Sequence, residues 1–126
     1  MLTRRVLLLL AAAAIVLEVG IGSAFAEHRA SRATFSAINR LLSPSARTLR
    51  DHLVSVDVSS KGPYALAFEA GGQDYRGLLK ENHRRWHYVA DVTVSTGLRC
   101  KVAPQAVIQD LHLLRYVTGH RCFGPR

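Results

Sequence analysis

Two histidines near the middle of the sequence are the residues best spaced to do chemistry. His83 and His87 stand four positions apart in the segment Asn82–His87. An i, i+4 pair of histidines can bind a metal ion from one face of a helix. Here the pair spans a polar turn and the start of an expected strand, so the spacing does not fix a binding geometry. A solvated hairpin tip is the favoured interpretation, and His83 and His87 are the pair predicted to hold a metal ion if one is bound.

His87 could instead act with Asp91 as a general acid and base. In an extended strand the two side chains would share one face, and general acid–base catalysis needs two such groups near the scissile bond. Lys80 or Arg84 would assist. The sequence contains no serine nucleophile elbow, phosphate-cradling loop, zincin helix or calcium loop. We therefore predict no catalytic residue and no cofactor, and keep a small secreted hydrolase as an alternative.

Cys100 and Cys122 are the two cysteines of the chain. An even number of cysteines in an exported domain predicts one disulfide. The bond would close a loop of about 23 residues and contribute about 3 kcal/mol through chain entropy. The alternatives are a redox pair or a metal-thiolate site, in which a free thiol could join His112 or His120 around a soft metal.

The first 26 residues have the layout of a secretory signal peptide. A basic head, Met1–Arg5, precedes the apolar run Val6–Leu17, and Ala24–Ala26 is a small-x-small cleavage site. The run is shorter than the about 20 residues that a membrane span needs. Thr3–Leu8 partly resembles the twin-arginine export motif, which leaves two export routes open. We predict cleavage after Ala26, a periplasmic or secreted location, and no stable membrane span afterwards.

The chain is strongly basic, with 17 Lys and Arg against 9 Asp and Glu and a formal net charge of +8 at pH 7. Such a charge attracts an acidic protein or an anionic envelope component, although scattered surface charge also serves solubility alone. The longest basic run is only Arg84–Arg85. Nucleic acid is not an expected partner, because sheet-based binding needs exposed aromatic residues and we assign Trp86 and Tyr88 to the core.

The periodicity of residues 27–126 predicts a single small α+β domain. Ser31–Leu42 has helical spacing, and Ser43 with Pro44 favours a second short helix over Pro44–Leu53. Four segments have the period of strands, namely Val54–Val58, Tyr64–Glu69, Gln73–Leu79 and Trp86–Val94. The turns between them are Ser59–Pro63, Gly71–Gly72 and Lys80–Arg85. A last helix begins at Pro104, with an apolar stripe of Val107, Ile108, Leu111 and Leu114 and a C-cap at Gly119.

Short turns between four strands predict an antiparallel meander with one buried and one solvated face. The three valines of Val54–Val58 would share the buried face. The same face would hold Trp86, Tyr88, Ala90, Val92 and Val94. The expected architecture is an N-terminal helix or helix pair, a four-stranded antiparallel meander and a C-terminal helix, with the helices on the inner face of the sheet.

Several short motifs follow one another within about residues 54–117: Tyr64–Ala67, Gly71–Gln73, Leu78–Lys80, and Trp86 with Val89. Their order resembles that of small exported bacterial domains of the copper uptake system-associated type. The resemblance implies a bacterial envelope location and supplies no catalytic residue. This sequence differs from the pattern by inserting Asp74–Arg76 after the glycine turn. Residues 27–126 contain no methionine, so they offer no thioether ligand for copper.

These features predict an exported, non-enzymatic accessory protein of the cell envelope. It would contact a protein or an anionic envelope component through a basic surface. The alternatives are a histidine-based metal-binding protein, through His83 and His87, and a small secreted hydrolase, through His87 and Asp91. The sequence leaves the identity of the partner and the oligomeric state open.

Overall fold

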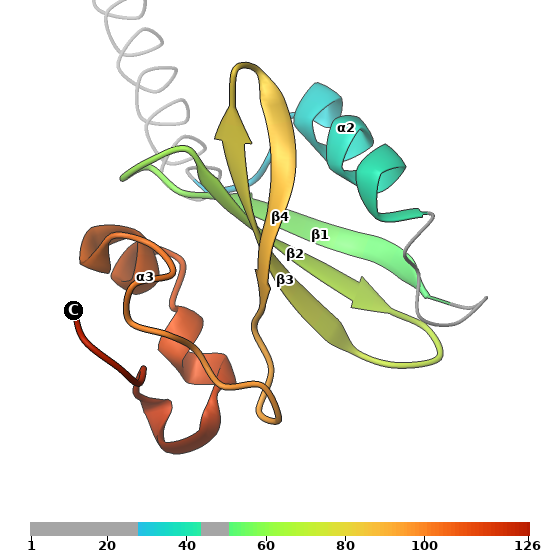
Figure 1. The fold of residues 1–126 in the computed structure, drawn as a ribbon. Coiled ribbons are helices and arrows are strands. Elements are labelled where there is room, and N and C mark those ends of the chain that lie inside the picture. The colour runs from blue at the N-terminus through green and yellow to red at the C-terminus, as the bar shows by residue number, and fades with distance from the viewer. Residues whose placement is uncertain (1–27, 44–50) are drawn as a thin grey trace, which may run out of the picture.

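The computed structural model describes residues 28–43 and 51–126 (Figure 1). In chain order the elements are α2 (Arg32–Leu42), β1 (His52–Val58), β2 (Tyr64–Ala70), β3 (Tyr75–Asn82), β4 (Arg85–Asp91) and α3 (Gln105–Asp110), followed by two 3-10 helices, Leu113–Tyr116 and Thr118–His120. The predicted signal peptide, residues 1–26, and residues 44–50 of the predicted second helix lie outside the described residues.

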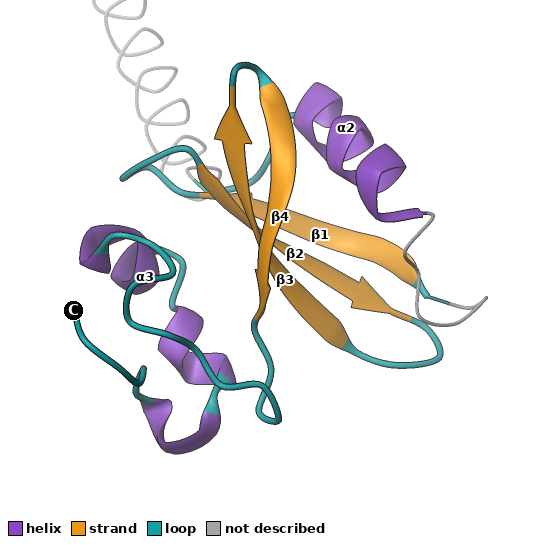
Figure 2. Ribbon diagram, in the orientation of Figure 1, coloured by secondary structure: helices purple, strands orange, loops and turns teal. Residues whose placement is uncertain are grey.

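The four strands form one antiparallel sheet in the order β1-β2-β3-β4, which confirms the predicted meander (Figure 2). The glycine turn between β2 and β3 is held by Asp51, whose carboxylate accepts the backbone N–H groups of Gly72 and Gln73 at 3.0 and 2.9 Å. The turn between β3 and β4 is shorter than Lys80–Arg85. It consists of His83 and Arg84 alone, both at positive φ, as two-residue hairpin turns of the primed types require.

The sheet is covered on both faces, so the prediction of one solvated face was wrong. Figure 1 shows α2 on one side and residues 92–126, which we call the C-terminal unit, on the other. Along β2, Tyr64 to Ala67 are all buried. Neighbouring strand residues point to opposite faces, so four consecutive buried residues require cover on both sides. Alanines that alternate with large residues along β2 are compatible with a solvated face, so the sequence pattern alone does not show that Ala65 and Ala67 are buried.

The C-terminal unit builds the larger core. Tyr64 and Leu66 of β2 and Leu78 of β3 form its sheet side. The unit contributes Val92, Leu98, Ala103, Val107, Ile108, Leu111, Leu113 and Val117. The unit has little regular structure, and this apolar contact is the main source of its stability on the sheet.

Helix α2 covers the opposite face with Ile38 and Leu42. Its sheet-side partners are Leu53, Val56, Ala65, Ala67 and Leu79. Ser31 caps the helix, since its hydroxyl accepts the backbone N–H of Thr34 at 3.2 Å. The predicted helix Ser31–Leu42 is confirmed. The end of the predicted helix Pro44–Leu53 is corrected, because His52 and Leu53 belong to β1, where Leu53 is buried against α2.

An irregularity in β1 changes which valines face the core. The register with β2 shifts between Leu53 and Ser55, which leaves Val54 as an extra residue. Val54 is therefore 47% exposed, whereas Leu53 and Val56 are buried beneath α2. The prediction that all three valines share a buried face was wrong because a bulge breaks the period of two.

A second bulge divides the predicted inner face of β4. Tyr88 pairs with Leu79 and Ala90 with Leu78, so Val89 is the extra residue. Trp86 packs in the α2 core, whereas Val92 lies in the core beneath the C-terminal unit. Strand β4 ends at Asp91, and Val94 beyond it is 68% exposed. The single apolar face predicted for Trp86 to Val94 is thus divided between the two sides of the sheet.

The predicted C-terminal helix is shorter than its apolar stripe suggested. Helix α3 ends at Asp110, and His112 takes left-handed backbone angles with a φ of 53°. The chain then continues in 3-10 turns, which bury Leu113 and Val117 while Leu114 is only partly buried. Gly119 lies within the second of these turns, with a φ of 72°, and does not cap a long helix. Breaking the helix at His112 lets more apolar side chains reach the sheet.

The predicted disulfide between Cys100 and Cys122 is confirmed, with a Cα–Cα distance of 5.0 Å. Backbone hydrogen bonds of 2.9 Å flank the bond: Cys100 N–H donates to Phe123, and Phe123 N–H donates to Leu98. The bond therefore fastens the C-terminal tail to the loop that follows β4.

Burial on both faces can be tested at two adjacent residues of β3. Leu78 and Leu79 are both fully buried, one in each core. We expect Leu78→Ala and Leu79→Ala each to lower the free energy of unfolding by about 2–5 kcal/mol in urea denaturation. Val54→Ala serves as the exposed control, with an expected loss of about 1 kcal/mol or less. A small loss for either leucine would mean that one face is open.

The disulfide generates a second prediction. Replacing both cysteines by Ser, as Cys100→Ser with Cys122→Ser, should lower the free energy of unfolding by about 3 kcal/mol, because the unfolded chain regains the entropy of the open loop. Denaturation of the oxidised protein and of the double variant measures the difference. Equal midpoints for the two proteins would contradict this account.

Candidate functional site

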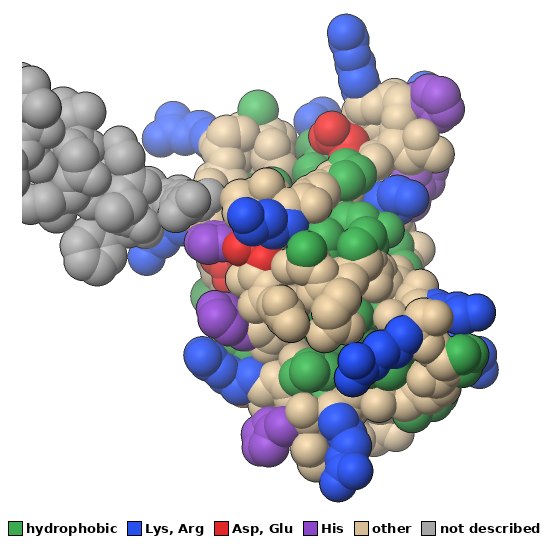
Figure 3. Space-filling view, turned by 90° about the vertical axis from the view of Figure 1, so that its left-hand side faces the viewer, with side chains coloured by type: hydrophobic (Ala, Val, Ile, Leu, Met, Phe, Trp, Pro, Cys, Tyr) green, Lys and Arg blue, Asp and Glu red, His purple; other side chains and the backbone are tan. Residues whose placement is uncertain are grey.

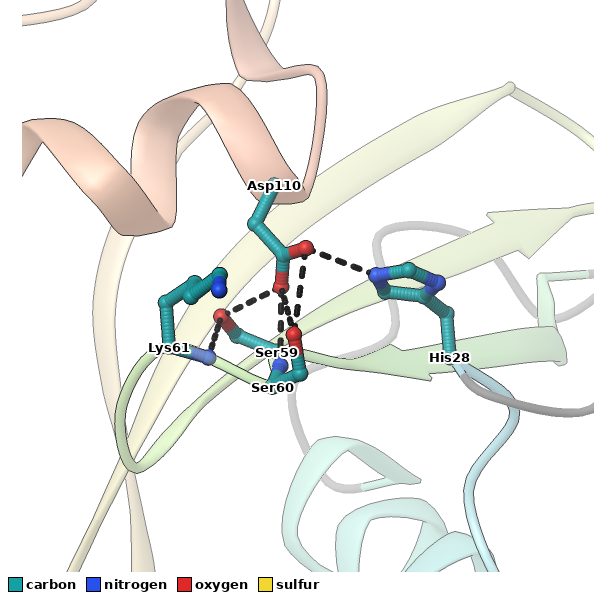
Figure 4. A network of polar contacts seen from close by, with 5 residues as sticks. All are labelled: His28, Ser59, Ser60, Lys61 and Asp110. Atoms are coloured by element: carbon teal, nitrogen blue, oxygen red, sulfur yellow. Dashed lines mark hydrogen bonds and ion pairs between the residues drawn. The ribbon is translucent and has the colours of Figure 1, made fainter. Parts of the chain in front are cut away.

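The carboxylate of Asp110, at the end of α3, is the centre of the main polar network (Figure 4). The Ser59 hydroxyl and the Ser60 backbone N–H both donate to Asp110 Oδ2 at 2.8 Å. The Ser60 hydroxyl lies 3.3 Å from both carboxylate oxygens. Nε2 of His28 lies 2.8 Å from Oδ1. One carboxylate is thus bound by donors from two other parts of the chain.

The backbone around these donors explains their positions. Ser59 and Ser60 begin the turn between β1 and β2, and the Ser59 hydroxyl also accepts the backbone N–H of Lys61 at 3.1 Å. His28 belongs to the short segment 28–30, which lies along β1: the Ala30 N–H donates to Val56, and the Val58 N–H donates to His28. The network therefore joins the C-terminal unit, the first turn of the sheet and the segment that precedes α2.

The network keeps Asp110 ionised. The side chain of Asp110 is only 12% exposed, and this burial by itself would raise the pKa of the carboxyl. The hydrogen bonds from His28, Ser59 and Ser60 act in the opposite direction and are stronger together, so the pKa lies well below its ordinary value of 3.8. The folded protein therefore stabilises the charged form of Asp110.

These residues are of the types found in serine hydrolases, but their order is different. In a catalytic triad the histidine lies between the serine and the aspartate and takes the serine proton. Here Ser59 and His28 both bind the same carboxylate, and the Ser59 hydroxyl donates a hydrogen bond to Asp110. Ser59 is also buried. The arrangement is a structural latch and does not activate a nucleophile.

The structure separates two of the candidate site residues named from the sequence. His87 pairs with Lys80, and Asp91 pairs with Gly77. Because the Val89 bulge lies between them, His87 and Asp91 fall on opposite faces of the sheet. The Asp91 carboxylate instead accepts a hydrogen bond from the Tyr88 hydroxyl. The predicted acid–base pair of the hydrolase alternative is therefore not assembled.

The candidate metal ligands are placed at one end of the sheet. His83 is at the tip of the β3–β4 turn and His87 is within β4, and both are exposed. In the described part of the chain, no three or more His, Cys, Asp or Glu residues form a group that could hold a metal ion. The His83–His87 pair as a metal ligand set stays a prediction. The soft-metal alternative at His112 or His120 is excluded, because both cysteines are in the disulfide.

The C-terminal unit is rich in positively charged side chains. Its cations are Arg99, Lys101, Arg115, Arg121 and Arg126, and its one carboxylate, Asp110, is already bound in the latch. Within residues 28–43 and 51–126, none of these cations forms an ion pair. Figure 3 shows the side of the molecule that carries this unit, with blue and purple side chains and no red in its lower part. The unit is thus a surface with uncompensated positive charge.

Aromatic rings hold several cations close to this surface. The Arg76 guanidinium of β3 lies 4.4 Å from the ring centre of Phe68 and 4.1 Å from that of Tyr116. Lys80 lies over Tyr64 at 5.5 Å, and Arg99 over Phe123 at 5.7 Å. Such cation–π contacts restrict a cation without neutralising it. The positive charge is therefore partly pre-oriented.

Comparison with known proteins gives no further assignment. No protein family, no curated protein and no solved structure matches the chain. The resemblance of about residues 54–117 to copper uptake system-associated domains stays a prediction. Among the helices of residues 28–43 and 51–126, none has the length and apolar character to cross a membrane.

Sequence reasoning missed the latch completely. Asp110 and Ser59 are 51 positions apart, and Asp110 and His28 are 82 apart. No local spacing brings such residues together. The one available signal was the pair Ser59–Ser60 in a predicted turn, because serines in turns often bind nearby backbone groups.

The latch predicts a specific pH dependence. We expect Asp110→Asn to lower the free energy of unfolding at neutral pH by about 1.5–3 kcal/mol, the usual contribution of hydrogen bonds to a charged group. Since folding lowers the pKa of Asp110, its contribution is full above the ordinary value of 3.8 and is lost as the pH falls further. The difference between wild type and variant, measured by urea denaturation, should therefore shrink in acid.

Asp74→Asn is the matched control, since Asp74 is exposed in the turn before β3. It should change the stability by about 0.5 kcal/mol or less. A stability difference for Asp110→Asn that stays constant down to strongly acidic pH would contradict the assignment of an ionised carboxylate.

Proposed function

We propose that this chain is an exported, non-enzymatic accessory protein that binds an anionic partner of the cell envelope through its C-terminal unit. The partner is an acidic protein or an anionic envelope component. Binding rests on charge complementarity, which speeds encounter and selects partners by sign.

One observation carries the proposal, namely the charge of the C-terminal unit. Five cations stand in this unit without an ion pair in the described part of the chain, while its one carboxylate is bound in the latch. Even with the ionised Asp110 counted, five cations outnumber one acidic side chain in this unit. The unit therefore carries a net positive charge.

The rigidity of the surface supports binding as its role. The disulfide fastens one end of the unit and the Asp110 latch fastens its middle. Arg76, between Phe68 and Tyr116, links the unit to β3. Groups that are ordered before binding lose less conformational entropy when a partner arrives.

The disulfide is compatible with an oxidising compartment outside the cytoplasm. This agrees with export by the predicted signal peptide, whose residues lie outside the described part of the chain. The periplasmic or secreted location belongs to the same proposal.

The proposal is tested with the protein purified from the envelope fraction of an expressing bacterium. It should bind immobilised poly-L-glutamate at low salt and be released at high salt, because salt screens exposed charges over about 10 Å at 0.1 M. Arg115→Glu with Arg121→Glu should weaken binding at least about tenfold, a change of about 1.4 kcal/mol. Arg32→Glu with Arg40→Glu changes the net charge equally but alters α2, on the other side of the sheet.

Equal weakening by both double variants would mean that net charge alone drives binding, and the assignment to the C-terminal unit would fall. An unchanged affinity at high salt would rule out charge complementarity. A pull-down from envelope extract at both salt concentrations then identifies the natural partner, and a single dominant protein or polymer released by salt is the expected result.

A further inference from the structure

A broad groove lies between the start of β3 and the C-terminal unit. Residues 73–76, in the turn before β3 and at its start, form one side of it. Residues 92–95 and 115–120 of the C-terminal unit form the rest. The volume of the groove is about 800 Å³. Binding sites for small molecules commonly have volumes of about 300–1,000 Å³, so the groove has room for a ligand of several sugar or amino-acid units.

The guanidinium of Arg76, a residue of the groove lining, is held in a defined orientation. It lies 4.4 Å from the ring centre of Phe68 and 4.1 Å from that of Tyr116. A guanidinium that stacks on aromatic rings keeps its N–H donors in its own plane, where the rings do not cover them. The orientation of these donors is therefore fixed before any ligand arrives.

The N–H donors of Arg76 are available to a ligand. Within residues 28–43 and 51–126, the side chain of Arg76 forms no hydrogen bond and no ion pair. No buried side-chain nitrogen in this part of the chain lacks a partner, so the donors of Arg76 reach solvent. A planar fork of N–H donors matches the two oxygens of a carboxylate. Arg76 is thus a preformed carboxylate site.

Other charged groups in the lining give the groove a positive balance. Arg115 and His120 come from the two 3-10 helices, and both are exposed. Nδ1 of His120 lies 3.3 Å from the carbonyl oxygen of Leu114, which leaves Nε2 for a ligand. The carboxylate in the lining is that of Asp74, which is exposed in the turn before β3. A ligand with several acidic groups is therefore attracted along the groove.

The apolar part of the lining is poorly suited to a peptide. Docked peptides gain affinity from apolar side chains in pockets or from a backbone ladder at a sheet edge. Val92 and Val117 are only 1% and 3% exposed, which leaves Val94 as the exposed valine of the lining. Strand β3 is paired on both sides, so it offers no edge. An acidic peptide would find charge in this groove but few other contacts.

Hydroxyl groups in the lining are suited to a sugar. They belong to Thr93, Ser95 and Thr118, besides the two tyrosines of the lining. The Thr118 hydroxyl donates to the carbonyl oxygen of Val94 at 3.0 Å, and its oxygen can still accept a hydrogen bond. A sugar carries several hydroxyl donors on each ring. The combination of hydroxyl acceptors with a carboxylate site therefore favours a sugar that carries carboxylates.

We infer that this groove is the binding site for an acidic glycan of the cell envelope, in which the sugars carry carboxylate groups. The Arg76 fork binds one carboxylate through both of its oxygens. Arg115 attracts the carboxylate of a neighbouring sugar, and Thr118 accepts a hydrogen bond from a sugar hydroxyl. This inference rests on the proposed function and narrows its partner to a sugar polymer.

The test compares three short probes by calorimetry at low salt. Tetragalacturonate is a chain of four sugars with one carboxylate each, maltotetraose is its neutral counterpart, and terminally blocked tetraglutamate carries four carboxylates on a peptide. Tetragalacturonate should bind at least about tenfold more tightly than either control. In nuclear magnetic resonance spectra of the unaltered protein, its addition should shift the side-chain N–H signal of Arg76.

Single variants locate the site within the C-terminal unit and β3. Arg76→Lys keeps the charge but loses the fork, and it should weaken tetragalacturonate binding at least about tenfold. Arg115→Gln should weaken it about threefold, whereas the matched control Arg99→Gln, outside the groove, should leave it nearly unchanged. Asp74→Asn removes a repelling carboxylate and should strengthen binding about twofold.

Thermal unfolding shows whether each variant is folded. If Arg76→Lys is not, the Arg76 signal of the unaltered protein and the exposed Arg115→Gln variant decide the question. An Arg76 signal that does not move, together with equal effects of Arg115→Gln and Arg99→Gln, would overturn the groove as the site.

The outcomes distinguish this inference from the proposed function. Binding of poly-L-glutamate without any preference for tetragalacturonate would overturn the glycan site and leave the proposed function standing. Binding of neither would overturn both. Tetraglutamate binding as tight as that of tetragalacturonate would assign the groove to an acidic protein, and equal binding of maltotetraose would overturn the role of the carboxylates.

Discussion

The placement of the C-terminal unit depends on the hydrogen bonds to the Asp110 carboxylate. A buried carboxylate is costly unless its oxygens are hydrogen-bonded. Its donors come from the segment before α2 and from the first turn of the sheet, so they are in reach only when all three parts are assembled. The apolar core attracts the unit to the sheet, but apolar contact has no direction. The hydrogen bonds of the latch fix the orientation of the C-terminal unit on the sheet.

The latch also shapes the surface. It binds the one acidic side chain of residues 92–126, while eight apolar residues of this unit are buried in the core against β2 and β3. The exposed side chains of the unit include seven arginine, lysine and histidine residues and no acidic one. Aromatic rings hold some of these cations in place without cancelling their charge. The same packing that stabilises the fold thus produces the surface on which the proposed function rests.

Two bulges determine which side of the sheet each side chain occupies. An extra residue shifts every later side chain to the opposite face, since the period of a strand is two. The bulge at Val54 exposes one predicted core residue, and the bulge at Val89 separates Trp86 from Val92 and His87 from Asp91. The hydrolase alternative depended on an unbroken period through β4.

Local patterns in the sequence determined the elements that depend on near neighbours. The helix of Ser31–Leu42, the four strands, the glycine turn at Gly71–Gly72 and the disulfide all follow from spacing, turn residues or cysteine count. Tertiary structure decided everything that depends on which distant residues meet. It covered the second face of the sheet, broke the last helix at His112, and brought His28, Ser59 and Asp110 together. The physical reason is that burial and hydrogen bonding stabilise the whole assembly, whereas periodicity reports only the local conformational preference of the chain.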